Sequence, residues 1–167
     1  MNNITALSNE TCQLGIQSRN MVLYIAKKDS PQPIRLMSSV GKQLPLYCTG
    51  LGRALLAYKS EEEIRSLFPE VLTAYTPHTI ATINDLLKEL ELTRQRGYAV
   101  EHEETNLMVN CIAVSLDYNN APIAALSISI PTFRISESKE KEAVQILWEA
   151  KQHIETHFKM YGVDFGN

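Results

Sequence analysis

The sequence lacks three features: a long apolar run, a cluster of Lys and Arg, and any basic-then-apolar leader at its N-terminus. No segment approaches the ~20 apolar residues that a membrane-spanning helix needs. The formal net charge of −3 provides no basic surface of the kind that holds nucleic acid through counterion release. We therefore expect a cytoplasmic protein that makes no membrane contact and that does not bind DNA by itself.

Cysteine is also scarce, with Cys12, Cys48 and Cys111 widely spaced and no C-x-x-C pair. An odd, scattered set of this kind favours reduced thiols over a disulfide framework. His102 lies next to Glu101 in an acidic run, but neighbours in a strand alternate faces and no ligand spacing accompanies them. We predict no metal site and no cofactor.

The 167 residues, 44% of them hydrophobic, are enough for one core and too few for two comfortable domains. Alternating apolar residues and turn signals predict a hairpin of two strands, a further short strand, and then an antiparallel meander with a turn over 117–122. The expected strands cover residues 11–18, 21–27, 34–39, 98–103, 108–116 and 123–130.

Helices are predicted by their caps. A capping box begins at Ser60, and the helix that follows is stopped by Pro69. A second capping signature at Thr82 opens a helix that Gly97 ends, and Ser136 caps a final helix. That final helix has a roughly heptad-like apolar stripe, which we expect to cover the sheet or a partner chain: Val144, Leu147, Trp148, Ile154, Phe158 and Tyr161.

The stretch from Thr49 to Ala57 joins a small-residue turn directly to an apolar helix start. Thr49 is a good N-cap, so the free amides of the first turn would lie at the positive end of the helix dipole, where an anion can bind. No Lys-Ser/Thr follows, so a small carboxylate fits better than a nucleotide triphosphate. An ordinary capped helix with tightly packed glycines is the competing interpretation.

Period-two alternation places Cys111 on one face of its strand with Ala113, and Ser127 with Ser129 on one face of the next strand. Buried hydroxyls need hydrogen-bond partners, and a ligand, neighbouring backbone or solvent can supply them. Cys111 has the same ambiguity, because a free cysteine in a strand is usually a small hydrophobe.

The segments PLYCTGLGRALLAY, TINDLLKELELTRQRGYAVEHEE and CIAVSLDYNNAPIAALSISIPTFRIS, with the final helix, resemble the C-terminal effector-binding domain of IclR-type transcriptional regulators. The resemblance covers nearly the whole chain, and "SISIPTFRIS" is closest to regulators of sugar-acid breakdown. It implies an α+β, GAF-like fold with helices flanking a curved antiparallel sheet. Residues 1–9 would be the remnant of a linker helix and residues 10–167 the effector-binding domain, while the family's winged helix-turn-helix is absent from this chain.

The same resemblance implies the ligand-sensing domain of a bacterial transcriptional regulator of the repressor class. First-turn amides would hold the carboxylate of a small organic acid, a sugar acid or 2-keto acid, and Glu101 would face a hydroxyl. Expected partners are this effector, further copies in a homodimer or homotetramer, and DNA only through the absent domain. The implied ligand-binding residues are Thr49, Gly50, Leu51, Glu101, Cys111, Ser127 and Ser129.

A GAF-like enzyme with Cys111 or Cys48 as nucleophile is the alternative. A hydrolytic thiol needs a base beside it, and no motif places any of the four histidines near either cysteine. We therefore favour a sensor, in which ligand binding shifts a population between two states and no chemistry is required.

Overall fold

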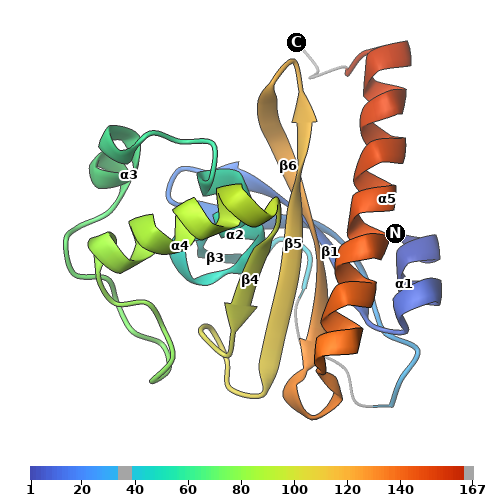
Figure 1. Ribbon diagram of the computed structural model, residues 1–167, viewed down its shortest axis with the longest axis horizontal. Helices are drawn as coiled ribbons and strands as arrows, with labels where there is room; N and C mark the ends of the chain where they lie inside the picture. Colours follow the sequence, from blue (N-terminus) through green and yellow to red (C-terminus); the bar gives the residue numbers. More distant parts are fainter. Residues whose placement is uncertain (34–38, 164–167) are drawn as a thin grey trace.

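The computed structural model describes residues 1–33 and 39–163, and its centre is one antiparallel sheet with helices on both faces (Figure 1). The strands lie in the order β3-β2-β1-β6-β5-β4. Their bounds are β1 (Thr11–Ser18), β2 (Met21–Lys28), β3 (Gln43–Pro45), β4 (Ala99–His102), β5 (Val109–Tyr118) and β6 (Ala121–Pro131). The helices are α1 (Asn2–Ser8), α2 (Gly50–Leu56), α3 (Glu61–Leu67), α4 (Ile83–Arg96) and α5 (Glu137–Tyr161), with short 3-10 turns η1 (Leu46–Cys48) and η2 (Thr132–Arg134).

Both predicted hairpins are confirmed, but the turn between β5 and β6 is tighter than expected. The prediction of a loop over 117–122 was wrong, because Asp117 pairs with Pro122 and Tyr118 with Ala121. Only Asn119 and Asn120 remain in the turn, both with positive φ, which matches the twist of the flanking strands.

β3 was not expected, because its three residues are too few for a periodic signal and its partner strand β2 is distant in sequence. The short strand predicted over 34–39 falls on residues 34–38, which lie outside the described residues.

The helix caps behave as predicted. The Ser60 hydroxyl accepts the amide of Glu63, and the Glu63 carboxylate accepts the amide of Ser60. The Thr82 and Ser136 hydroxyls cap α4 and α5 by accepting the amides of Asp85 and Lys139, and Gly97 ends α4 in the left-handed conformation at φ 77°. These local signals need no tertiary contact, which explains why the sequence located the helix starts well.

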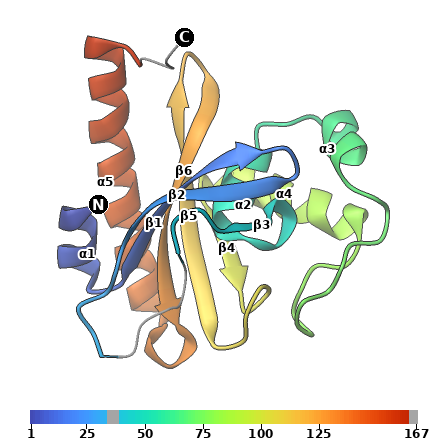
Figure 2. The same ribbon diagram turned by 180° about the vertical axis from the view of Figure 1, so that it is seen from behind.

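Two apolar cores occupy the two faces of the sheet. One face is covered by α1 and α5, which pack on side chains such as Ile112 and Ile128. The other face is covered by α2 and α4, with Leu55 and Leu86 fully buried there. Figure 2 shows β1 and β2 bending across towards α2, so that the sheet curves around this second face. The predicted α+β class with a curved antiparallel sheet is confirmed.

The stripe of α5 is buried only in part. Val144 and Leu147 are buried, whereas Trp148 is 39% and Tyr161 80% exposed. Within residues 1–33 and 39–163, no helix combines the length and apolar character needed to cross a membrane.

Candidate functional site

A row of polar side chains crosses the sheet face beneath α2. Strand register sets Thr11 of β1 opposite Ser129 of β6, Ser129 opposite Cys111 of β5, and Cys111 opposite Glu101 of β4. Paired residues in adjacent strands point to the same face, so these four side chains lie side by side. We call them the polar row. Three of them were predicted as site residues; Thr11 was not.

Hydrogen bonds link the polar row to the next residues along the strands. The Ser129 hydroxyl lies 3.0 Å from Cys111 Sγ and donates to Gln13 Oε1 at 2.8 Å. Ser127 donates to the same oxygen at 3.2 Å. The partner of both buried hydroxyls is therefore a side chain, Gln13, rather than neighbouring backbone. Gln13 was missed, although its two-residue spacing from Thr11 in an expected strand was an available signal.

Glu101 is a buried carboxyl group at one end of the polar row, with 1% of its surface exposed. Its Oε1 accepts the amides of Glu104 at 2.6 Å and Thr105 at 3.2 Å. Burial raises the pKa of Glu101 to about 7, despite these two hydrogen bonds. Near neutral pH this group can therefore either donate or accept a proton in a hydrogen bond.

The thiols near this carboxyl group hold their protons. Burial raises the pKa of Cys48 to about 12, and burial with the nearby Glu101 raises that of Cys111 well above its ordinary value. Because the thiolate is the nucleophilic form, neither cysteine is activated for covalent chemistry. Tyr24, which the sequence analysis did not single out, belongs to the same group, since burial, Cys111 and Glu101 all raise the pKa of its hydroxyl.

The first turn of α2 lies directly against the polar row. A Cβ built on Gly50 would be 3.2 Å from Cys111 Cβ, so two predicted site residues are in contact. The Thr49 hydroxyl accepts the Gly52 amide at 3.1 Å and donates to Pro45 O at 3.1 Å, and the Thr49 amide lies 3.5 Å from Leu46 O. Within the described part of the chain, the amides of Gly50 and Leu51 have no hydrogen-bond acceptor.

The glycines themselves are explained by packing. A Cβ on Gly52 would lie 2.1 Å from Leu46 O, and one on Gly50 would press on strand β5. This close packing agrees with the competing interpretation of tightly packed glycines, and it leaves the proposal of a ligand at the first-turn amides untested. What remains available to a ligand is the pair of amides, at the edge of the polar row.

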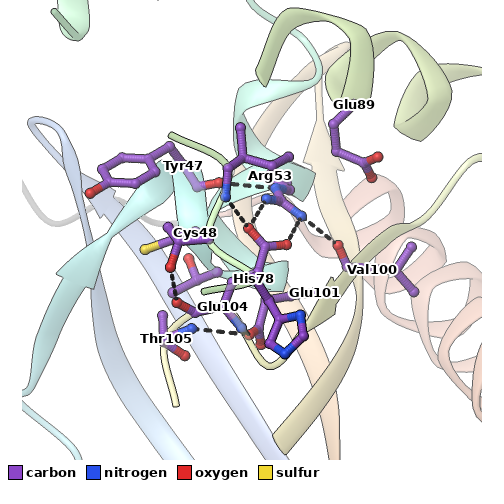
Figure 3. Close-up of polar contacts among 12 residues, drawn as sticks. Tyr47, Cys48, Arg53, His78, Glu89, Val100, Glu101, Glu104 and Thr105 are labelled. Carbon is purple, nitrogen blue, oxygen red and sulfur yellow. Dashed lines mark hydrogen bonds and ion pairs between the residues drawn. The ribbon is translucent and has the colours of Figure 1, made fainter. Parts of the chain in front are cut away.

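A buried ion pair holds α2 in this position, and no sequence pattern predicted it. The Arg53 guanidinium makes two hydrogen bonds to the Glu104 carboxylate, at 2.6 and 2.5 Å (Figure 3). It also donates to Tyr47 O and Val100 O, both at 2.9 Å. Arg53 thus joins the α2 segment to the β4 segment and fixes the distance between Gly50 and the polar row.

The described ranges contain no group of three or more His, Cys, Asp or Glu residues arranged to hold a metal ion. The site therefore offers hydroxyls, an amide oxygen, a carboxyl group, thiols and two free backbone amides. These are groups that bind a small polar molecule through hydrogen bonds.

Comparison with known proteins supports this interpretation. The family model described as "Bacterial transcriptional regulator IclR C-terminal" matches residues 1–156. The HTH-type transcriptional regulator KdgR of Dickeya chrysanthemi is 38% identical over 156 residues, which is 92% of this chain and 51% of that protein. The HTH-type transcriptional repressor AllR of Escherichia coli K12 is 33% identical over 158 residues, 93% of this chain and 58% of the repressor. The chain thus spans little more than half the length of these curated relatives.

Solved structures agree with the fold. The C-terminal domain of E. coli KdgR superposes with a TM-score of 0.85 at 33% identity, covering 98% of this chain and 94% of that one. The Thermotoga maritima IclR structure gives a TM-score of 0.87 at 32% identity, covering 97% of this chain and 65% of that one.

Proposed function

Because this chain belongs to the family of bacterial transcriptional regulator IclR C-terminal domains, we propose that it senses a small organic acid and passes the signal to a DNA-binding segment. Its relatives are transcriptional regulators rather than enzymes. The alternative of a thiol enzyme loses its support, because the thiols of Cys48 and Cys111 hold their protons.

The observation that carries the proposal is the contact between the start of α2 and the polar row. Gly50 touches Cys111, and the unpaired amides of Gly50 and Leu51 lie at the positive end of a helix. Two amides are the donors that a carboxylate accepts from. These donors lie beside a buried polar row, on a sheet face that is otherwise covered by an apolar core. This arrangement supports the proposal that the ligand is an acid.

The other groups favour a hydroxylated or keto acid. The hydroxyls of Ser129 and Ser127 and the Glu101 carboxyl group can exchange hydrogen bonds with ligand hydroxyls or a ketone. Glu101 in its protonated form would also avoid repulsion from the ligand's carboxylate. This donor set supports the sugar-acid or 2-keto-acid class. The residues proposed to contact the ligand are Thr49, Gly50, Leu51, Glu101, Cys111, Ser127 and Ser129.

Contact with DNA is proposed to belong to a helix-turn-helix segment that these residues do not contain, since the curated relatives are longer and carry that term in their names. Such regulators bind paired half-sites, which requires at least a twofold assembly. We therefore propose a homodimer or homotetramer in the cytoplasm.

A thermal-shift screen of sugar acids, 2-keto acids and aromatic acids tests the ligand class. A ligand at 100 times its dissociation constant should add roughly 2.7 kcal/mol to the free energy of unfolding. Calorimetry on Ser129→Ala should then show a loss of on the order of 0.5–1.5 kcal/mol in binding free energy.

Ser66→Ala is the matched control, because Ser66 is exposed on α3 and bonds only to its own helix. It should bind like the parent chain. The proposal fails if no acid stabilises the protein, or if Ser129→Ala and Ser66→Ala bind equally well.

A further inference from the structure

Two histidines lie on the exposed side of α5. His153 and His157 are four residues apart, so their side chains leave the same face of the helix. Both side chains are exposed, and their ring centroids lie 4.6 Å apart. The adjacent Ile154 and Phe158 pack against the core of the sheet, which turns the two imidazoles towards solvent. The histidine pair is therefore accessible to a ligand from outside the chain.

The separation of the two rings fits binding to one metal ion. With metal–nitrogen bonds of about 2.0–2.1 Å, two imidazoles on the same ion have ring centroids about 4.5–5 Å apart. The observed 4.6 Å lies in this range. Two histidines at positions i and i+4 on one helix face also form the zinc-binding pair of helical metal sites. The helix thus holds both rings close to the positions that an ion requires.

A hydrogen bond leaves one nitrogen of His157 available for a metal ion. Its Nδ1 lies 3.1 Å from the carbonyl oxygen of His153. A carbonyl oxygen can only accept, so Nδ1 carries the proton of the neutral ring and Nε2 has the lone pair. Histidine ligands of metal ions usually donate their other ring N–H in this way, which fixes the orientation of the ring.

The charges around the histidine pair favour a cation. Glu149 is exposed and lies four residues before His153, on the same face of α5. Lys151 and Lys159 are each two residues from a histidine of the pair, which places them about 200° around the helix. Lys151 forms an ion pair there with Glu155 at 2.6 Å. The nearest charge on the face of the histidines is therefore negative.

One copy of the chain does not complete the coordination of such an ion. Among the described residues, no group of three or more His, Cys, Asp or Glu is placed to hold a metal. The last turns of α5 extend beyond α1 (Figure 1 and Figure 2), where another helix can approach. Tyr161 follows His157 by four residues, with its ring 5.8 Å away, and both Tyr161 and Met160 are exposed. Exposed apolar side chains next to the pair favour a second copy of the chain at this face.

We propose that His153 and His157 form half of a site for a divalent transition-metal ion of the zinc, nickel or copper class, and that the same pair of a second copy forms the other half. A twofold axis through the ion places each pair opposite its equivalent, so that four imidazole nitrogens surround the ion. The ion joins two α5 helices. The expectation of no metal site rested on the surroundings of His102 and did not consider this spacing.

Calorimetry and sedimentation velocity on the EDTA-treated and dialysed chain test the proposal, with Zn²⁺ as the probe. We expect one Zn²⁺ ion to bind per two chains. At a Zn²⁺ concentration ten times its dissociation constant, the dissociation constant of the dimer should fall by roughly 10-fold, because the ion binds the dimer in preference to the monomer. EDTA should reverse the effect, and Mg²⁺, which prefers oxygen ligands, should not reproduce it.

His153→Ala and His157→Ala should each lose both Zn²⁺ binding and the change in assembly, and circular dichroism checks that the exposed substitutions leave the fold intact. His78→Ala is the matched control, because it removes an exposed histidine from the loop before α4; it should behave like the parent chain. The proposal is overturned if Zn²⁺ does not bind at micromolar concentration, or if one ion binds per chain without a change in sedimentation. It is also overturned if His157→Ala and His78→Ala respond equally to Zn²⁺. None of these outcomes depends on an acid binding at the polar row.

Discussion

At the scale of single residues, buried polar side chains distinguish this sheet face from an ordinary apolar core. Ser129 and Ser127 share one acceptor on Gln13, and Glu101 is held by two backbone amides. Burying a polar group costs folding free energy unless the group is hydrogen-bonded. Because these groups bond to one another and to the backbone, the position of each side chain depends on the others.

Glu101 should make stability depend on pH. Its pKa is about 7 in the folded chain and 4.5 as an isolated group, so the folded state holds the extra proton between these values. Stability should therefore fall as pH rises from 4.5 to 7, by about 3 kcal/mol in total from this group. Glu101→Gln cannot ionise, and its urea-unfolding free energy should lack this decrease. Parallel pH curves for the two proteins would disprove the assignment.

Glu104 should be more important for stability than exposed carboxylates. Glu104→Ala leaves Arg53 buried without its partner, which costs about 3–5 kcal/mol. Glu61→Ala is the control, because the Glu61–Arg65 pair is on the surface and contributes about 0–1 kcal/mol. Chemical denaturation of both variants measures the difference, and equal losses would show that the buried pair is not what holds α2.

At the scale of elements, the position of α2 against the sheet depends on close backbone approach. η1 and the first turn of α2 touch so closely that only a glycine fits at residue 52. This contact sets the direction of the helix, while Gly50 and Arg53 set its distance from β5 and β4.

Gly52→Ala should therefore destabilise the chain by about 3 kcal/mol or more, because the new methyl would overlap Leu46 O. Gly41→Ala is an informative comparison: its φ of +86° is unfavourable for alanine, but a Cβ there has no neighbour within 4 Å. We expect only about 1–2 kcal/mol from that backbone strain. Thermal unfolding of the two variants separates steric from conformational cost, and a tolerated Gly52→Ala would contradict the packing.

At the scale of the whole molecule, the two faces of the sheet have different tasks. The face under α2 holds the polar row, and the face under α5 holds an apolar core. Large apolar side chains on α5, such as Met160 and Tyr161, are left exposed at 68% and 80%. Exposed apolar groups on a long helix are typical of contacts between copies.

We expect sedimentation velocity to show a dimer or tetramer at micromolar concentration. Replacing Met160 and Tyr161 by Glu should shift the distribution towards the monomer, because burying two charges opposes the contact. Tyr75→Glu, at a 52% exposed position away from α5, should leave assembly unchanged. A parent chain that sediments only as a monomer would refute the prediction.

The same chain should not retard duplex DNA in gel shifts. Its net charge of −3 supplies no counterion-release contribution to binding. Retardation that weakens with added salt would show that a basic surface exists after all.

The parts of the fold that could be predicted from the sequence are those that short-range chemistry controls. The helix starts at Ser60, Thr82 and Ser136 are set by side chains within three residues of the cap. The strands are indicated by the alternation of apolar and polar residues over a few positions. The sequence also placed Cys111, Ser127 and Ser129 on candidate faces, since side-chain direction in a strand has a period of two. Glu101 was named only through the family resemblance.

Which residues those faces contact depends on how distant parts of the chain pack together. Register between strands distant in sequence set Thr11 beside Ser129 and Gln13 beside Ser127, and no local pattern specifies a register. The Arg53–Glu104 pair and the contact of Gly52 with Leu46 also depend on how η1, α2 and β4 pack. Packing in three dimensions, rather than local preference, therefore holds the glycine-rich start of α2 tightly against η1 and β5. The same packing brings polar residues that are far apart in the sequence into one connected row.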